Sequence, residues 1–343
     1  MNSADQKWMQ RAIQLALKGK GQVAPNPLVG CVIVHEDQVI GEGYHEKYGG
    51  PHAEVNAINA IADKTLIPYA TLYVTLEPCS HQGKTPPCAD LIIREGFTKV
   101  VVGSIDPNHK VSGKGVAKLR EHDIHVTVGV LRQACEEINP FFLEAHLHKK
   151  PYYLLKWAQS KDGFIFNPSK QRQLSGPESQ KLVHQLRADY QGILIGKRTA
   201  LNDNPSLTVR LIEGQNPIRI VLMHQWDPEL EKGTLFQDQF STLYLNTTKE
   251  GQQGNKEWIL IPEENTWKSI NKILLQRGIQ SVMVEGGTQV LSQLIDENWW
   301  NEIIKIKTAI QLDGGLAAPD FQGRIKETRE VGTDQWIHFI NHG

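Results

Sequence analysis

Three side chains of the kinds that bind zinc are spread over residues 52–88 and must meet at one point if they act together. They are His52, which is followed by Ala53 and Glu54, and two cysteines that each follow a proline, Cys79 and Cys88. A catalytic zinc ion takes three protein ligands and leaves a fourth position for water, whose proton becomes easier to remove. One imidazole, two thiolates and a spare carboxylate are the set that zinc-dependent deaminases use. The first half of the chain is therefore expected to fold around a deaminase centre.

Glu54 is expected to transfer protons and not to bind the metal. It lies two residues after His52, so on a helix the two side chains would point about 200° apart and could not share one ion. A helical zinc protease would need a second histidine four residues after the first, where this chain has Asn56. The spacing excludes that pattern and leaves the carboxylate available for acid–base work.

The segment between the two cysteines predicts a basic loop and a helix start. Eight residues separate the cysteines, and we expect Lys84 and Thr85 among them to reach an anionic substrate from a loop beside the metal. Pro86 and Pro87 suit the start of a helix, which places the Cys88 sulfur in the first turn. The helix dipole favours a thiolate there, as zinc does.

An alternative is that these residues simply pack in a core, since a single cysteine or histidine usually does. The chain contains only four cysteines, so two of them would have to take these offsets by accident. The other two fit the packing interpretation, because Cys31 lies in the apolar run 29–34 and Cys135 lies in an expected helix.

Length and charge limit the class of protein and its partners. A chain of 343 residues is long for one core and favours two domains, expected at 1–148 and 149–343. With 37 basic and 38 acidic residues the net charge is −1, so neither a nucleic acid nor a membrane is an expected partner. Few cysteines and a polar N-terminus without an apolar segment favour the cytoplasm. The expected partner is a small molecule.

Both halves alternate strands with helices, which predicts a central sheet covered by helices in each. In the first half the pattern predicts a helix over 3–19, strands at 29–34, 38–42, 71–75, 99–103 and 124–128, and helices after His52, from Cys88 and near 115–121. In the second half it predicts strands at 152–158, 192–196, 218–223, 242–245, 258–261, 281–284, 303–308 and 335–340, and helices at 177–188, 266–277 and 288–297. Residues 249–256 are expected to form a mobile loop.

The second half contains a weaker signal for a cofactor. A strand ending near Glu285 runs into Gly286, Gly287 and a helix, where glycines and amides at a helix start can approach a pyrophosphate. A tight turn explains the two glycines equally well, and no G-x-G-x-x-G supports a Rossmann domain. At this point Arg187 and Arg210 are either solvated charges or phosphate contacts.

Over nearly its whole length the chain resembles the bifunctional riboflavin-biosynthesis deaminase/reductases. The matching segments read Pro-Asn-Pro-Leu-Val-Gly at 25–30, His-Ala-Glu at 52–54, Leu-Glu-Pro-Cys-Ser-His at 76–81, Gly-Lys-Thr-Pro-Pro-Cys at 83–88, Asp-Pro-Asn at 106–108, Asp-Gly at 162–163, Asp-Asn-Pro-Ser-Leu-Thr-Val-Arg at 203–210 and Glu-Gly-Gly at 285–287. The resemblance implies an α/β protein with an N-terminal cytidine-deaminase-like three-layer α/β/α domain and a C-terminal dihydrofolate-reductase-like α/β domain. It implies zinc-dependent hydrolytic deamination of 2,5-diamino-6-(5-phosphoribosylamino)pyrimidin-4-one. NADPH-dependent reduction of the ribosyl arm, giving 5-amino-6-(5-phosphoribitylamino)uracil, would follow.

The resemblance also implies roles for individual residues. In the deaminase it implies zinc ligands and a proton carrier at His52, Cys79, Cys88 and Glu54, and a substrate pocket at Asn26, His45, His81, Lys84, Asp106 and Asn108. In the reductase it implies cofactor contacts at Ala158, Thr199, Asp203, Gly286 and Gly287, and substrate contacts at Lys156, Arg187, Leu207, Arg210 and Glu285, with Lys156 also catalytic. A homo-oligomer formed through the reductase domain is a further expectation.

Two departures from the family pattern keep alternatives open. Lys161 stands where many members have leucine, and Gln173 stands where they have a tryptophan that contacts the cofactor. An active deaminase with an impaired reductase half is therefore one alternative. A nucleoside- or RNA-editing zinc deaminase is another, although the neutral charge and the second half argue against it. A third is a scaffold protein with structural zinc, whose site would be closed by a fourth protein ligand.

Overall fold

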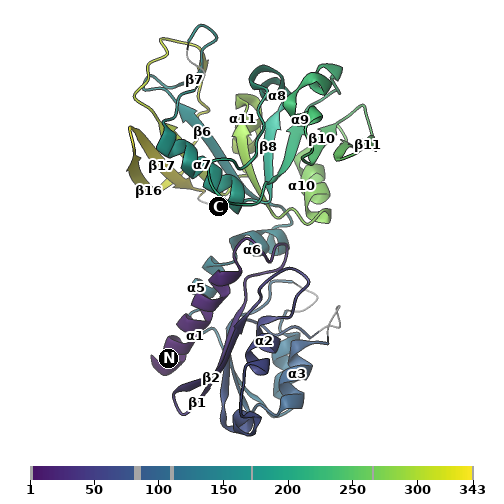
Figure 1. Cartoon of the computed structure of the whole chain (residues 1–343), viewed down its shortest axis with the longest axis vertical. Coiled ribbons are helices and arrows are strands. Elements are labelled where there is room, and N and C mark those ends of the chain that lie inside the picture. The colour runs from purple at the N-terminus through teal and green to yellow at the C-terminus, as the bar shows by residue number, and fades with distance from the viewer. Residues whose placement is uncertain (1–2, 81–85, 109–111, 171–172, 265, 342–343) are drawn as a thin grey trace. The chain divides into compact units, whose positions relative to one another are not determined.

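The computed structural model describes residues 3–80, 86–108, 112–170, 173–264 and 266–341. The chain divides into two compact units, Met1–Lys149 and Lys150–Gly343, each built on its own large sheet (Figure 1). Among the helices in the described ranges, none has the length and apolar character needed to cross a membrane.

The first unit is a five-stranded sheet between two layers of helices. Its elements are α1 (Ser3–Ala16), η1 (Leu17–Gly19), β1 (Gly30–His35), β2 (Gln38–Tyr44), α2 (Ala53–Asn59), η2 (Lys64–Tyr69), β3 (Thr71–Leu76), α3 (Cys88–Glu95), β4 (Lys99–Ser104), α4 (Lys114–Glu121), β5 (His125–Val128), α5 (Arg132–Glu137) and α6 (Pro140–Leu147). The order is β2-β1-β3-β4-β5. β1 is antiparallel to β2 and β3, whereas β3, β4 and β5 run parallel.

Alternation along the strands fills both faces of this sheet with apolar side chains. On one face Cys31 and Ile33 pack with α2, α3 and α4, and on the other Val32 and Val34 pack with α1. Figure 1 shows α1 and α5 on one side of the sheet and α2 and α3 on the other. A Cβ at Gly30 would lie 2.0 Å from a carbonyl oxygen of α1, so glycine permits that close packing. The expected three-layer α/β/α fold is confirmed for this unit.

The second unit is a ten-stranded sheet whose centre is parallel. Its elements are β6 (Tyr152–Gln159), β7 (Phe164–Phe166), α7 (Pro177–Asp189), β8 (Gly192–Gly196), α8 (Lys197–Asp203), β9 (Ile218–Leu222), η3 (Pro228–Lys232), α9 (Thr234–Gln237), β10 (Thr242–Asn246), β11 (Gly251–Gln253), β12 (Lys256–Leu260), α10 (Thr266–Gln276), β13 (Ser281–Gly286), α11 (Thr288–Asp296), β14 (Glu302–Lys307), β15 (Leu316–Ala317), β16 (Arg324–Val331) and β17 (Asp334–Ile340). The order is β11-β12-β10-β9-β8-β13-β6-β14-β17-β16, and β7 pairs separately with β15.

Helices cover both faces of the parallel centre. Leu194 lies in a core with α10 and α11, whereas its neighbours Ile193 and Ile195 lie in a core with α8 and α9. Strands buried on both sides are apolar throughout and do not alternate, as β8 shows. All strands from β12 to β14 in the sheet order are parallel, so their carboxyl ends share one edge.

Most expected elements end within two residues of their predicted limits. The edge strand β16 falls outside the prediction, because its residues are almost all exposed and no apolar alternation marks it. The expectation of a mobile loop at 249–256 is wrong. β11 pairs with β12 across a turn at Gly254, and the buried Lys256 ammonium donates to the carbonyl oxygens of Asp238 and Phe240 at 2.9 and 2.6 Å.

Candidate functional site

The three expected zinc ligands meet in the first unit. His52 lies immediately before α2, Cys79 lies in the loop after β3, and Cys88 is the first residue of α3. One ligand atom of each lies within 4.8 Å of the others. The His52 Nδ1 is 3.6 Å from the Cys79 Sγ and 3.3 Å from the Cys88 Sγ. The predicted placement of the ligands at two helix starts and the loop between them is confirmed.

This cluster has the dimensions of a catalytic zinc site. Nitrogen and sulfur ligands on a tetrahedral zinc ion lie about 3.6 Å apart, given bonds of about 2.1 and 2.3 Å. Among the described residues, no fourth histidine, cysteine, aspartate or glutamate joins the group. Three ligands match the pattern of a catalytic zinc site, in which three protein groups bind the ion and water takes the fourth position.

Hydrogen bonds make the two thiols unequal. The Cys88 backbone N–H donates to the Cys79 Sγ at 3.3 Å. A hydrogen bond from the Cys88 thiol, followed by those from His52 and the backbone, lowers the pKa of Cys79. The same bond to Cys79, together with burial, raises the pKa of Cys88. Cys79 is therefore the first to become a thiolate, and Cys88 would release its proton when zinc binds.

Glu54 lies in the first turn of α2, with only 3% of its surface exposed. Burial raises its pKa to about 6, and the negative charge of Cys79 acts in the same direction. A carboxyl group with this pKa can accept and release a proton near neutral pH. Its position and pKa suit the proton-transfer role expected of it.

His45 and Asn26 form a wall beside the cluster. The His45 ring packs edge-on against the His52 ring at 5.7 Å. Its Nδ1 is 2.9 Å from the carbonyl oxygen of Pro51, and its Nε2 is 3.1 Å from the Asn26 Nδ2. Because Nδ1 must donate to that carbonyl, Nε2 accepts from the amide, and burial lowers the pKa of His45. The structure thus holds a neutral imidazole of fixed tautomer beside the zinc ligands.

Asp106 and Asn108 follow β4, the parallel neighbour of the strand that leads to Cys79. The Asn108 backbone N–H donates to the Asp106 carboxylate at 2.8 Å, so the two residues share one turn. His81, Lys84 and Thr85 lie outside the described residues.

In the second unit a buried carboxylate, Glu285, lies between two cations. Arg187 of α7 donates hydrogen bonds of 2.9 Å to both of its oxygens, and the Lys156 Nζ is 3.7 Å from Oε2. Burial raises the pKa of Glu285, but the charges of Lys156 and Arg187 outweigh it and bring the pKa to about 2. Burial also lowers the pKa of Lys156. Glu285 therefore stays ionised, and Lys156 loses its proton more easily than an exposed lysine.

The segment that carries Arg210 is held against α7. The Arg210 backbone N–H donates to the His184 Nδ1 at 2.8 Å, and the Arg187 guanidinium donates to the Thr208 carbonyl oxygen at 3.2 Å. The Arg210 guanidinium donates to the Thr208 hydroxyl at 2.9 Å and to the Ser206 hydroxyl. Burial, followed by the charges of Arg187 and Arg210, lowers the pKa of His184 to about 4. This histidine is therefore a neutral acceptor at physiological pH.

The charges around Glu285 suit an anionic substrate. Lys156, Arg187 and Arg210 carry three positive charges against one negative charge, a balance of two positive charges (3 − 1). Arg187 directs three donor bonds into the protein, whereas within the described residues the guanidinium contacts of Arg210 involve Nη1 alone. Arg210 is thus better placed than Arg187 to bind a phosphate.

The turn at Gly286 and Gly287 joins β13 to α11 beside the first turn of α8. Gly286 has a φ of 129°, which residues with a side chain rarely adopt. A Cβ at Gly287 would lie 3.1 Å from the Thr199 hydroxyl oxygen. Two helix starts therefore meet here at the carboxyl ends of β8 and β13, a position that suits a pyrophosphate.

Three other residues that were expected to contact cofactor or substrate lie outside the turn at Gly286 and Gly287. Ala158 is half-buried near the end of β6 and pairs with Ile306 of β14. Asp203 is the exposed last residue of α8, at the opposite end from Thr199. Leu207 is buried in the core with Val221, so a substrate contact there would come from its backbone.

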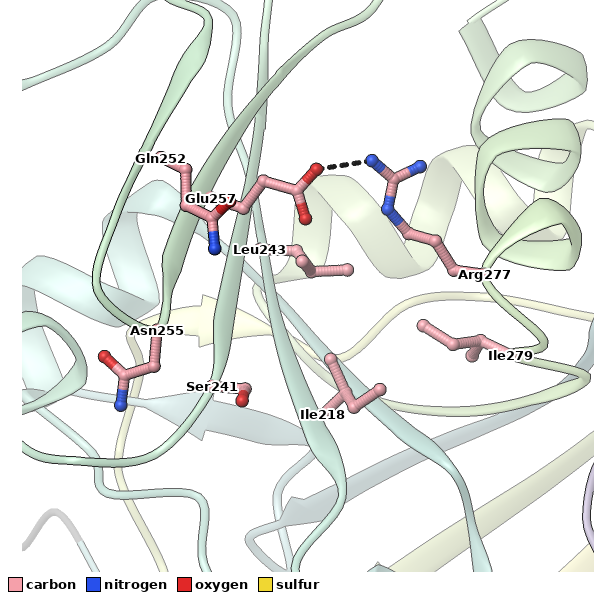
Figure 2. A pocket seen from close by; sticks show the side chains of 8 residues that line it. All are labelled: Ile218, Ser241, Leu243, Gln252, Asn255, Glu257, Arg277 and Ile279. Atoms are coloured by element: carbon pink, nitrogen blue, oxygen red, sulfur yellow. Dashed lines mark hydrogen bonds and ion pairs between the residues drawn. The ribbon is translucent and has the colours of Figure 1, made fainter. Parts of the chain in front are cut away.

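A cavity of about 250 Å³ lies at the amino ends of parallel strands in the second sheet, opposite the ends where Gly286 and Gly287 lie (Figure 2). Its lining residues, near the starts of β9, β10 and β12, are Ile218, Ser241, Leu243, Gln252, Asn255, Glu257, Arg277 and Ile279. Figure 2 shows Glu257 paired with Arg277, an ion pair of 2.5 Å. Parallel sheets bind ligands at the carboxyl ends of their strands, so this cavity is not the cofactor site.

The two departures from the family pattern involve exposed side chains. Lys161 is exposed, and the following Asp162 accepts backbone N–H bonds of 3.1 and 2.8 Å from residues 312 and 313. The turn therefore forms with lysine present. Gln173 is also exposed, and its amide donates to the hydroxyl and carbonyl oxygens of Ser175.

Sequence patterns did not single out three residues that support these sites: Glu77, Asn139 and His184. His184 lies one helical turn before Arg187, a spacing that signals a shared helix face. Glu77 lies two residues before the ligand Cys79. Asn139 carries no local signal, because its partner lies 111 residues away.

Comparisons with known proteins cover both units. The family model "Cytidine and deoxycytidylate deaminase zinc-binding region" matches residues 2–104, and "RibD C-terminal domain" matches residues 151–319. "Riboflavin biosynthesis protein RibD" of Actinobacillus pleuropneumoniae is 45% identical, covering 98% of this chain and 95% of its own length. The protein of the same name from Aquifex aeolicus is 38% identical and covers 98% of both chains.

Solved structures resemble the whole chain as well. A Thermotoga maritima diaminohydroxyphosphoribosylaminopyrimidine deaminase/5-amino-6-(5-phosphoribosylamino)uracil reductase has a TM-score of 0.86 at 34% identity, covering 98% of this chain and 99% of its own. Acinetobacter baumannii RibD has a TM-score of 0.87 at 31% identity, covering 98% of each chain.

Proposed function

The chain belongs to the RibD family of bifunctional riboflavin-biosynthesis deaminase/reductases, and we propose which of its residues carry the two reactions. It is a deaminase and reductase of the riboflavin pathway, with a cytidine-deaminase zinc fold in the first half and a dihydrofolate-reductase-like fold in the second. Its pyrimidine substrate is a small molecule and its cofactors are zinc and NADPH. The finer assignments below are proposals.

The deaminase substrate we propose is 2,5-diamino-6-(5-phosphoribosylamino)pyrimidin-4-one, as the name of the Thermotoga relative suggests. His52, Cys79 and Cys88 would hold zinc. The bound ion would lower the pKa of a water molecule, so that hydroxide is available as the nucleophile at neutral pH. Glu54 takes a proton from the attacking water and passes it to the amino group at ring position 2. The ring carbon gains an oxygen, the carbon–nitrogen bond breaks and ammonia leaves. The convergence of three ligands with a buried, non-ligating Glu54 carries this proposal.

The deaminase pocket is proposed to include Asn26, His45, Asp106 and Asn108, together with His81 and Lys84. Asn26 and His45 hold each other in one orientation, which preserves the shape of the wall beside the zinc ligands. Lys84 supplies a cation for the substrate phosphate.

In the reductase we propose that Gly286, Gly287 and Thr199 receive the pyrophosphate of NADPH, with Asp203 and Ala158 as further contacts. Bound NADPH would supply the hydride that reduces the first carbon of the ribosyl arm, and the ring oxygen released from that carbon must then receive a proton. Lys156, whose pKa is lowered by burial, is the residue we propose for that proton.

Arg210 is proposed as the main phosphate contact of the reductase, and Arg187, Glu285 and Leu207 as the frame that positions the substrate. The excess of two positive charges (3 − 1) around Glu285 supports this assignment. The formed turn at Lys161 supports a working reductase over an impaired one.

One assay tests both halves of the proposal. Purified protein is incubated with the diaminopyrimidine substrate, with and without NADPH, while ammonia and the nicotinamide absorbance are followed. We expect ammonia release in both samples and NADPH oxidation when the cofactor is present. Ammonia release without any NADPH oxidation would establish the impaired-reductase alternative.

We also propose a cytoplasmic location, without nucleic-acid or membrane partners, and a homo-oligomer formed through the second unit. The location rests on four free cysteines and the balanced charge. The oligomer rests on β16, an exposed edge strand with unpaired backbone groups. Light scattering on the protein with and without a proline at an exposed β16 position tests the oligomer, which the proline should dissociate.

A further inference from the structure

Glu77 is a buried carboxylate whose hydrogen bonds with the described residues go to backbone N–H groups. It lies between the end of β3 and Cys79, and only 4% of its surface is exposed. Its Oε2 accepts the backbone N–H groups of Asp106 at 3.2 Å and Gly113 at 2.9 Å, and its Oε1 accepts that of Val116 at 3.1 Å. One side chain thus holds both ends of the loop that follows β4 and the first turn of α4.

Two further contacts join this loop and α4 to residues 77–79, which end in the proposed zinc ligand Cys79. The Glu77 backbone N–H donates to the Ser104 carbonyl at 2.9 Å, which continues the pairing of β3 with β4. A Cβ at Gly115 would lie 2.0 Å from the Pro78 carbonyl oxygen, so the first turn of α4 packs directly on the residue before Cys79. Movement of the loop relative to Cys79 would have to break both sets of contacts.

The charge of Glu77 explains why the attachment is strong. Among the described residues no lysine, arginine or histidine forms an ion pair with it. A buried carboxylate needs hydrogen-bond donors, and those that the described residues supply are the amides of Asp106, Gly113 and Val116, the last of them in the first turn of α4. Moving Asp106 and Gly113 away would cost the carboxylate these donors, which opposes their displacement from Glu77.

We propose that Glu77 is a positioning residue of the deaminase, which fixes Asp106 and Asn108 relative to the zinc ligand Cys79. This inference rests on the proposed function, in which Asp106 and Asn108 contact the substrate. Glu77 would act on the substrate through Asp106 and Asn108. Its role is to make the pocket wall and the metal centre one rigid frame.

The test is Glu77→Gln, which keeps the volume but directs an NH2 group at backbone donors. Deaminase KM should rise at least about tenfold, the effect of losing one buried hydrogen bond to a charged group, while kcat stays within about threefold. Zinc content should not change. Hydrogen exchange should accelerate in residues 105–118 and stay constant in α2.

Controls separate this role from simpler ones. Glu136→Gln removes a carboxylate that also contacts the end of β4, through a 2.9 Å bond from Ser104, and should leave KM unchanged. Asp106→Ala should raise KM by itself, and adding Glu77→Gln to it should raise KM little further. If Glu77→Gln does not fold, Glu77→Asp, which is one methylene shorter, should show the same changes.

The outcomes distinguish the inference from its premise. A KM that rises in Asp106→Ala but not in Glu77→Gln overturns the positioning role alone. An unchanged KM in Asp106→Ala overturns the substrate contact on which that role depends. Zinc loss in Glu77→Gln with an unchanged KM would mean that the residue serves Cys79 and not the loop.

Discussion

The side chain of Asn139 makes two hydrogen bonds with the backbone of Leu28, although the residues are 111 positions apart. Its Oδ1 accepts the Leu28 N–H at 2.7 Å, and its Nδ2 donates to the Leu28 carbonyl at 2.8 Å. The segment before β1 thereby gains the pairing that a neighbouring strand would otherwise supply. The same segment carries Asn26, which contacts His45 in the candidate pocket. The shape of that pocket therefore depends on a residue between α5 and α6.

Asn139→Ala should destabilise the first unit and weaken substrate binding by the deaminase. Two backbone groups of Leu28 lose their partner, at a cost of about 1–3 kcal/mol. We expect a lower Tm by calorimetry and a higher deaminase KM. Asn139→Asp keeps the acceptor and loses the donor, so its Tm and its deaminase KM should lie between those of the wild type and those of Asn139→Ala. Identical Tm and KM in Asn139→Ala would show that Asn26 is held by other contacts.

Cys88→Ser should lose most of its zinc. Serine has nearly the same size but is a poor zinc ligand, and the other two proposed ligands that the described residues place here are His52 and Cys79. Metal analysis after dialysis should show well under one zinc ion per chain, with deamination lost in proportion. Cys31→Ser, at a buried cysteine of β1 that is not among the expected ligands, serves as the control and should retain zinc. Full zinc occupancy in Cys88→Ser would overturn the ligand assignment.

Much of the deaminase centre was predictable because its signals are local. Prolines before Cys88 and the helix that begins at Ala53 specify backbone geometry within a few residues, and zinc chemistry demands the ligand types. The alternation of strands with helices likewise predicted a sheet covered on both faces. The structure agrees, since Cys31 packs in the core on one face of β1 and Val32 packs in the core on the other.

The supporting contacts were not predictable, because they join residues that no sequence period connects. Glu77 meets Val116, and Asn139 meets Leu28, only after the sheet has formed. β16 escaped prediction for another reason. An edge strand exposed on both faces needs no apolar alternation, so its sequence resembles that of a polar loop.

Arg210→Ala should weaken substrate binding in the reductase and spare the cofactor. A guanidinium–phosphate contact is charge-assisted, and its loss should raise substrate KM by about 10- to 100-fold. NADPH affinity, measured by fluorescence titration, should change less than about twofold. Arg324→Ala, at an exposed arginine on β16, is the matched control. An equal loss of NADPH affinity would place Arg210 in the cofactor subsite.

Glu285 should make the second unit acid-sensitive. Its pKa is about 2 when folded and 4.5 ordinarily, so its ionised form stabilises the fold fully above pH 4.5. That contribution is lost as pH falls from 4.5 towards 2. Glu285→Gln should be less stable at neutral pH, because Lys156 and Arg187 lose their buried counter-charge, and should depend less on pH below 4.5. Tryptophan fluorescence can follow this, since seven of the eight tryptophans lie in the second unit. An unchanged slope would rule Glu285 out as the source.

Glu54→Gln should abolish one activity and preserve the other. Glutamine fills the same volume but cannot take a proton from water or deliver it to the departing amine, so deamination should fall at least about a hundredfold. Zinc content should stay normal because Glu54 is not among the ligands. The reductase residues belong to a separate compact unit with its own sheet, so NADPH oxidation with pre-deaminated substrate should keep its wild-type rate. Cys31→Ser gives the control for a buried change near α2. Loss of both activities in a folded, zinc-loaded variant would show that the two sites are coupled and that neither unit can be analysed alone.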